Sequence, residues 1–323
     1  MAVQEQKPPV NDPTEHIHIL CREVTHHRDA LLASGADYAA LFGASASEYG
    51  LWLTQEHQPQ TSYRVVPSRC KTLFDRIVST YGDRAGEHFL QLVAAHEILA
   101  LPARMHTADI PASVLPWITR CVQRMLDDLA APRTGYFSHD NDPFAKDLAV
   151  CRLKMFPCGI EMVDTDMAFP RSALWKFGPA VGWQLGRALL AMGGNRPMLG
   201  SHIDRRAIRE FNPKGYLRLY HAVADILRLR QNIRGLMAQA WLLDAAVGRV
   251  SPELAFLHDV PAAAGAVFFP AYGDDRAVAD AIRMSPHRRK LYDAGEFKPC
   301  AYVMVWPRPA LLRWAKNHPL TDG

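Results

Sequence analysis

Two side chains that can bind a metal ion, separated by a single residue, occur in the segment PMLGSHIDRRAIREFNPKGY, residues 197–216. They are His202 and Asp204. Non-haem iron oxygenases hold their metal with two histidines and one carboxylate, and a His-x-Asp pair supplies two of these ligands. His258, further along the chain, would complete an iron site. In the structural alternative, Asp204 starts the next turn and His202 is hydrogen-bonded at the end of a buried strand.

The N-terminal half offers a second set of metal ligands on predicted helices. Di-iron carboxylate proteins use Glu and Glu-x-x-His motifs from facing helices. No Glu-x-x-His occurs in residues 84–130, and the adjacent His96 and Glu97 point to different faces of their helix. In the alternative, His96 fills an amphipathic stripe and the other groups are solvated. The candidate ligands are Glu87, His88, His96, Glu97, His106 and His139.

Cysteine and serine chemistry has less support in the sequence. The chain has six cysteines and no Cys-x-x-Cys pair. Cys158 lies beside Gly159 at a strand break, and a Cys–His enzyme would need a histidine within its reach. No motif identifies such a histidine, and no Gly-x-Ser-x-Gly is present. We therefore expect reduced cysteines, several of them buried in the core.

These residues must be positioned by two different halves of the chain. Residues 1–14 are polar and Pro-containing, which predicts a disordered tail. Residues 15–139 are predicted to form a helical domain, because apolar residues recur at helical spacing in GEHFLQLVAAHEILAL and in SVLPWITRCVQRMLDDLA. The segment 131–143 is dense in turn formers, so the boundary is placed there. Residues 140–323 form the second predicted domain.

The second half alternates strands with helices, which predicts an α/β fold of the mixed α+β type. Its clearest helix is 213–230, with Asn212 as N-cap and Pro213 at the first helical position. The predicted elements around it are strand 197–203, strand 236–244, short helix 252–258 and strand 265–270.

This order of elements resembles the later half of the GNAT superfamily of acyltransferases. In that family two central parallel strands splay apart, and the pantetheine arm of acyl-CoA enters the gap. The helix between the strands presents its N-terminus to the pyrophosphate, where backbone N–H groups and the helix dipole favour an anion. The resemblance implies a thioester donor, acyl-CoA or an acyl carrier protein, and an amine or hydroxyl acceptor on a small molecule.

The resemblance also implies where the phosphates would bind. The helix begins Asn212-Pro213-Lys214-Gly215, and Arg209 precedes it. Arg209, Lys214 and Gly215 are the predicted cofactor-binding residues. The family pattern Arg/Gln-x-x-Gly-x-Gly/Ala is absent, and residues 252–258 contain no tyrosine to match the family's acid.

The predicted catalytic residues come from the ends of two neighbouring strands. If these strands are parallel, His202 and Asp244 lie at the same edge of the sheet, where α/β proteins place their sites. His202 would deprotonate an amine, and Asp244 would orient the histidine or bind the amine. In the alternative, Asp244 caps a turn before Gly248.

Bulk composition limits the function classes. Hydrophobic residues make up 49% of the chain, charged residues 22%, and the formal net charge is +4. This charge is too small to require nucleic acid, and no apolar run approaches the ~18 residues that span a membrane. We expect a cytoplasmic N-acyltransferase acting on a small molecule, with a homodimer left open. The alternatives are an iron or di-iron oxygenase and a non-catalytic binding protein.

Overall fold

The computed structural model divides the chain into two compact units, Met1–Pro157 and Cys158–Gly323. The structure describes residues 12–33, 39–55, 63–168, 178–194, 197–271, 275–283 and 285–320.

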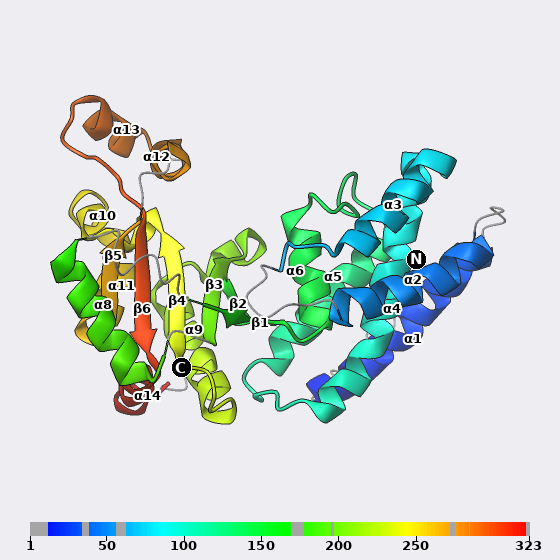
Figure 1. The fold of residues 1–323 in the computed structure, drawn as a ribbon, viewed down its shortest axis with the longest axis horizontal. Coiled ribbons are helices and arrows are strands. Elements are labelled where there is room, and N and C mark those ends of the chain that lie inside the picture. Colours follow the sequence, from blue (N-terminus) through cyan, green and yellow to red (C-terminus); the bar gives the residue numbers. More distant parts are fainter. Residues whose placement is uncertain are drawn as a thin grey trace, which may run out of the picture. The chain divides into compact units, whose positions relative to one another are not determined.

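The first unit consists of helices followed by one short strand (Figure 1). Its elements are α1 (Pro13–Ala33), α2 (Ala39–Gln55), α3 (Ser68–Tyr81), α4 (Asp83–Thr107), α5 (Leu115–Ala130), α6 (Asp142–Cys151) and β1 (Met155–Pro157). The predicted stripe of α4 is buried at Phe89, Leu92 and Val93. Pro116 lies in the first turn of α5, where it removes no helical hydrogen bond. The helical prediction for this half is therefore confirmed.

The turn-rich segment 131–143 precedes a further helix of the same unit. The side chain of Asn141 accepts a hydrogen bond from the backbone N–H of Phe144 and so caps α6. α6 then packs against α4 and α5, and for this reason the first unit continues to Pro157, beyond the predicted boundary at residue 139. Of the predicted tail, residues 1–11 lie outside the described part of the chain, and α1 begins at Pro13.

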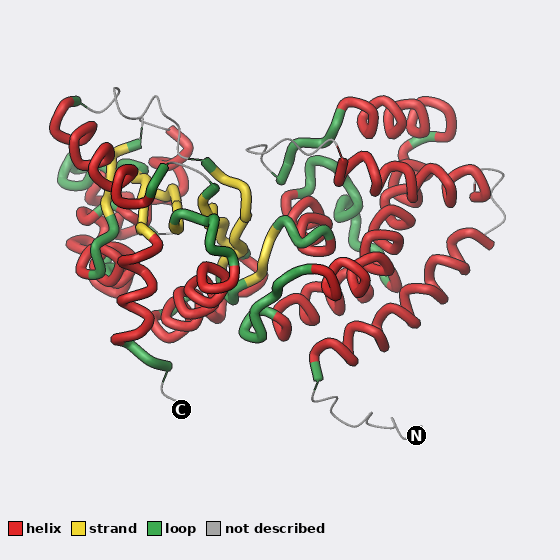
Figure 2. The backbone as a smooth tube through the Cα atoms, turned by 60° about the horizontal axis from the view of Figure 1, so that its bottom comes forward, coloured by secondary structure: helices red, strands yellow, loops and turns green. Residues whose placement is uncertain are grey.

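The second unit is a mixed α/β structure, as predicted (Figure 2). Its strands are β2 (Glu161–Met167), β3 (Met198–Ile203), β4 (Gly235–Ala240), β5 (Val267–Pro270) and β6 (Tyr302–Pro307). Its helices are α8 (Pro179–Met192), α9 (Pro213–Leu229), α10 (Ala245–Val250), α11 (Phe256–Ala263), α12 (Asp275–Arg283), α13 (Pro286–Asp293) and α14 (Arg308–Asn317). The 3₁₀ turns are η1 (Arg205–Glu210), η2 (Trp241–Leu243) and η3 (Pro252–Leu254).

Two predicted elements end differently in the structure. The strand predicted over 236–244 ends at Ala240, because Trp241–Leu243 form the 3₁₀ turn η2. The short helix predicted over 252–258 begins as η3 and continues as α11. The Ser251 side chain makes no cap bond; its hydroxyl instead accepts a hydrogen bond from Arg288.

The strands of the second unit lie in the order β2-β3-β4-β6-β5. β3 and β4 are parallel, because α9 carries the chain back across the sheet between them. The other neighbouring pairs in this set are antiparallel. A mixed sheet with a single parallel pair results.

Helices cover both faces of this sheet. On one face, α8 packs over Met198, Met237, Phe269 and Val305. Trp306 is the neighbour of Val305, so its side chain points to the opposite face. There it meets Tyr220 of α9, with ring centroids 5.0 Å apart. The two faces are called the α8 face and the α9 face below.

Candidate active site

The parallel pair β3 and β4 separates part of the way along its length. The two strands pair at Leu199 with Leu236 and at Gly200 with Met237, and no later pair follows. β3 nevertheless continues to Ile203 on its partner β2, and β4 continues to Ala240 on its partner β6. Residues 201–203 and residues 238–240 are therefore not paired with each other, and the two strands diverge there. We call this gap the strand fork.

Helix α9 begins shortly after β3 leaves the fork. Its first turn is closed by Asn212, whose side-chain oxygen accepts the Gly215 N–H at 3.0 Å. Since Pro213 has no N–H, Lys214 holds the one first-turn N–H that makes no hydrogen bond in this described segment. The helix thus offers an anion one backbone donor, supplemented by the exposed side chains of Lys214 and Arg209.

Gly215 has a structural task in the turn that leads into α9. A Cβ at this position would lie 1.9 Å from the carbonyl oxygen of Glu210. Because its N–H already bonds to Asn212, Gly215 acts by allowing the backbone to approach closely. Its predicted contact with a cofactor is not tested by the structure.

A buried polar cluster lies on the α9 face next to the fork. The carboxylate of Glu161 accepts hydrogen bonds from Ser201 on β3 and from Tyr216 on α9, the latter at 2.9 Å. Burial, and then the charge of Glu161, raises the pKa of Tyr216 well above its usual value, so the phenol stays protonated and donates. These three residues tie β2, β3 and the first turns of α9 together.

His202 lies on the opposite face of the same strand. Its neighbour Ser201 points to the α9 face, so His202 shares the α8 face with Gly200 and Met198. It pairs across β2–β3 with Met162 and is half-buried. The predicted general base therefore lies on β3 within the fork, on the face away from Tyr216.

Asp244 makes the contacts expected of a capping residue. One of its oxygens accepts the Ala246 N–H at 2.8 Å and caps α10, and the other lies 3.4 Å from the Cys300 nitrogen. β3 and β4 are adjacent and parallel, so the condition on which the prediction rested is met. The capping alternative for Asp244 matches these contacts, whereas its catalytic role remains a prediction.

The iron site has no geometric support. Asp204 is bound by Arg206, whose Nε lies 2.8 Å from a carboxylate oxygen. His258 contacts the neighbouring Asp259 at 3.0 Å instead. Among the described residues, no group of three His, Cys, Asp or Glu side chains is arranged to hold a metal ion.

The predicted di-iron ligands of the helical half and the predicted cysteine nucleophile also lack geometric support. In the first unit Glu97 pairs with Arg104 at 2.7 Å, and His139 contacts the Tyr49 hydroxyl at 2.5 Å. In the second unit Cys158 is buried, and burial raises the pKa of its thiol, followed by the effect of Glu161. A thiol held protonated in this way is a poor nucleophile at neutral pH.

A cavity of about 870 Å³ runs along the α9 face between α9, α11 and α14. Its lining is rich in aromatic rings: Tyr216, Tyr220, Phe256 and Trp314. It begins at Pro213, the first residue of α9, and reaches Arg313 on α14 and His318 directly after that helix. This aromatic groove has the size and the largely apolar character of a small-molecule site.

Sequence reasoning missed the partners of Glu161. The alternation of Glu161 with apolar residues in a short strand is compatible with a polar pocket wall, and Tyr216 belongs to the inner stripe of α9. Nothing in the sequence signals that the two meet.

No described helix is both long and apolar enough to cross a membrane.

One solved structure resembles this chain over most of its length. It is an acyltransferase crystallised in complex with decanoyl-CoA, with a TM-score of 0.50 and 14% sequence identity. The match covers 89% of this chain and 87% of that chain. At this identity the likeness shows the fold alone. No family model and no curated protein matches the sequence.

Proposed function

We propose that this protein is a GNAT-like acyltransferase that moves an acyl group from acyl-CoA to an amine or hydroxyl of a small molecule. The strand fork carries the proposal. The parallel pair loses its pairing after Gly200 and Met237, so the two strands diverge there. An extended pantetheine arm would lie between diverging strands in the way that an added strand does. The resemblance in fold to an acyltransferase with bound decanoyl-CoA supports the same reading.

The donor's phosphates would lie at the start of α9. Arg209 and Lys214 are exposed, and neither side chain has an ion pair within the described part of the chain. Together with the Lys214 N–H they supply positive charge where the chain leaves the fork. The adjacent aromatic groove offers room for the apolar or aromatic parts of the donor.

The proposed transfer needs one proton acceptor. The acceptor nitrogen attacks the thioester carbon, its C–N bond forms, and the C–S bond breaks to release CoA as the thiolate, which becomes the thiol when the proton lost by the nitrogen is returned to it. His202, half-buried in the fork, would take the proton that the nitrogen loses. Asp244 would keep the turn after β4 in place through its cap of α10.

Donor binding can be tested by calorimetry with decanoyl-CoA. In the double variant Arg209→Ala/Lys214→Ala, affinity should fall about tenfold or more, because charge-assisted bonds to phosphate are lost. The matched control is Arg249→Gln, an exposed cation on α10. Equal affinity in the double variant and the wild type would contradict this placement of the phosphates. Absence of any decanoyl-CoA binding would contradict the donor itself.

Turnover can be followed as thiol release from decanoyl-CoA with a panel of amines. His202→Ala should lower kcat by about 10²-fold or more while donor affinity stays the same. His287→Ala, an exposed histidine on α13, serves as the control. Undiminished turnover in His202→Ala would remove this residue from the reaction. Donor binding without turnover by the wild type would favour the non-catalytic alternative.

A further inference from the structure

A second cavity of about 500 Å³ lies on the α8 side of the sheet, and the proposed reaction does not use it. It is formed by α8, the start of β5, the end of β6 and the start of α14. Pro307, the last residue of β6, pairs with Gly235, the first residue of β4. The strand fork is at the other end of β4. The cavity is therefore at the opposite end of the sheet from the fork.

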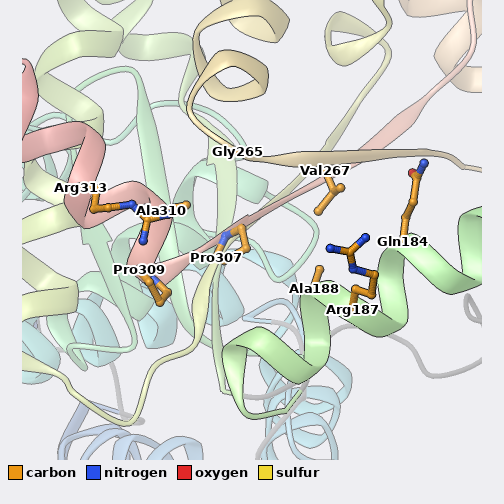
Figure 3. A pocket seen from close by; sticks show the side chains of 9 residues that line it. All are labelled: Gln184, Arg187, Ala188, Gly265, Val267, Pro307, Pro309, Ala310 and Arg313. Atoms are coloured by element: carbon orange, nitrogen blue, oxygen red, sulfur yellow. The ribbon is translucent and has the colours of Figure 1, made fainter.

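The polar side chains of this cavity are two arginines, which only donate hydrogen bonds, and one glutamine, which can donate through its amide nitrogen. Arg187 and Gln184 come from α8, and Arg313 comes from α14. Figure 3 shows the two α8 side chains on one side of the cavity and Arg313 on the other, with Val267, Pro307 and Ala310 between them. No carboxylate is among the described residues that line the cavity.

Neither arginine is neutralised by the protein. Across the residues that the structure describes, the guanidinium groups of Arg187 and Arg313 form no ion pair and no hydrogen bond. Both side chains are exposed at the rim. Elsewhere in this unit the guanidinium groups of Arg206, Arg218 and Arg228 each pair with a carboxylate. The two cavity arginines thus keep their donors available for a ligand.

We propose that this cavity binds an organic anion, a carboxylate or phosphate monoester attached to an apolar body. The anionic group would bond to Arg187 and Gln184, since a guanidinium fork matches carboxylate and phosphate oxygens. The apolar body would lie over Val267, Pro307 and Ala310, toward Arg313. Pro307 has no N–H, so the middle of the cavity suits a chain or ring better than a polar group.

Arg313 connects this cavity with the aromatic groove, because it lines both of them. An anion bound near α14 would change the charge that the groove presents at that end. The site is nevertheless separate from the fork, so its occupant is a second ligand and does not react there.

The test is calorimetric titration of the full chain with octanoate, octyl phosphate and octanol. Octanoate or octyl phosphate should bind saturably at one site, and octanol should not, because it lacks the charge. Arg187→Gln should weaken the binding about tenfold or more, whereas Arg249→Gln should not change it. A preference between octanoate and octyl phosphate identifies which anionic group the site takes.

Two results would overturn the proposal. One is that neither anion binds. The other is that Arg187→Gln binds octanoate as tightly as the wild type, which would assign that binding to the aromatic groove. Because Arg187 has no part in the strand fork, Arg187→Gln should bind decanoyl-CoA normally. Failure of this site is thereby distinguished from failure of the proposed acyl transfer.

Discussion

Asp147 in the helical unit and Lys214 in the α/β unit show two uses of a charged side chain. Asp147 is fully buried and accepts hydrogen bonds from Tyr136 at 2.6 Å and from Cys121 at 3.1 Å, with Arg124 3.8 Å away. Lys214 is exposed at the start of α9, and its ammonium has no partner among the described residues. The first group is fully engaged with the protein, and the second is available.

The difference follows from the cost of burying charge. A buried carboxylate without partners would be strongly destabilising, so Asp147 must be satisfied within the unit. An exposed ammonium is solvated at little cost and can exchange water for a ligand. Asp147 therefore serves to hold the helices of its unit together, whereas Lys214 keeps its charge for the ligand that is proposed above. Three predictions follow, in order of decreasing effect.

The largest effect is expected from Asp147→Ala. It leaves Tyr136 and Cys121 without their acceptor in a buried site, which should reduce the stability of the helical unit by about 3 kcal/mol. Hydrogen-exchange mass spectrometry of α5 and α6 peptides would show this loss as faster exchange. Asp127→Ala is the control, because Asp127 is exposed on α5 and its carboxylate accepts a solvent-exposed hydrogen bond from the Gln123 side chain at 2.9 Å. Similar exchange rates in both variants would contradict the conclusion that the buried Asp147 holds the helices of its unit together.

The second prediction compares two glycines of the α/β unit. Gly215→Ala places a Cβ 1.9 Å from a backbone oxygen of Glu210, so the turn into α9 must shift, at a cost of about 2 kcal/mol. Gly186→Ala meets nothing within 4 Å in α8 and should stabilise that helix by about 0.5–1 kcal/mol. The melting temperature should fall for Gly215→Ala and rise for Gly186→Ala. A neutral Gly215→Ala would show that the turn adapts and that Gly215 has some other task.

Features encoded by neighbouring residues could be predicted from the sequence, whereas contacts between distant elements could not. Asn212 and Pro213 predict the start of α9 from adjacent positions in the sequence, and the structure contains the predicted N-cap. The GNAT resemblance implied a parallel pair of strands on either side of this helix, and β3 and β4 are parallel. The cluster of Glu161, Ser201 and Tyr216 was not predicted, because it joins three elements whose register is set by the folded sheet.

Asp244 illustrates a short-range pattern that has two interpretations. A carboxylate after a buried strand predicts either a site or a cap, and the pattern does not separate the two. The structure shows bonds from its oxygens to the backbone of Ala246 and Cys300. Cys300 is distant in sequence, so this second bond could not have been foreseen. The iron hypothesis for His202 and Asp204 likewise has no support, since Arg206 pairs with the carboxylate.

The smallest predicted effect concerns Asp142 at the start of α6. Burial alone would raise the pKa of this carboxyl group, but hydrogen bonds from Tyr63 and Lys146, together with the charges of Lys146 and Arg64, lower the pKa from 3.8 to about 2. A carboxyl group whose pKa is lowered in the folded state contributes stability above its unfolded pKa. That contribution is lost as the pH falls from about 4 to about 2. Since the group is partly exposed, we expect less than about 1 kcal/mol.

Asp142→Asn should flatten this part of the stability curve. Hydrogen exchange of α6 peptides, corrected for intrinsic rates and measured between pH 2 and pH 5, would show a weaker pH dependence than in the wild type. Asp140→Asn is the control, because Asp140 is exposed and its carboxylate has no ion pair in the described chain. If Asp142→Asn kept the wild-type slope, the bonds from Tyr63 and Lys146 would not hold the carboxylate charged. The helical unit would then contain an acidic group that, like Lys214, is not committed to structure.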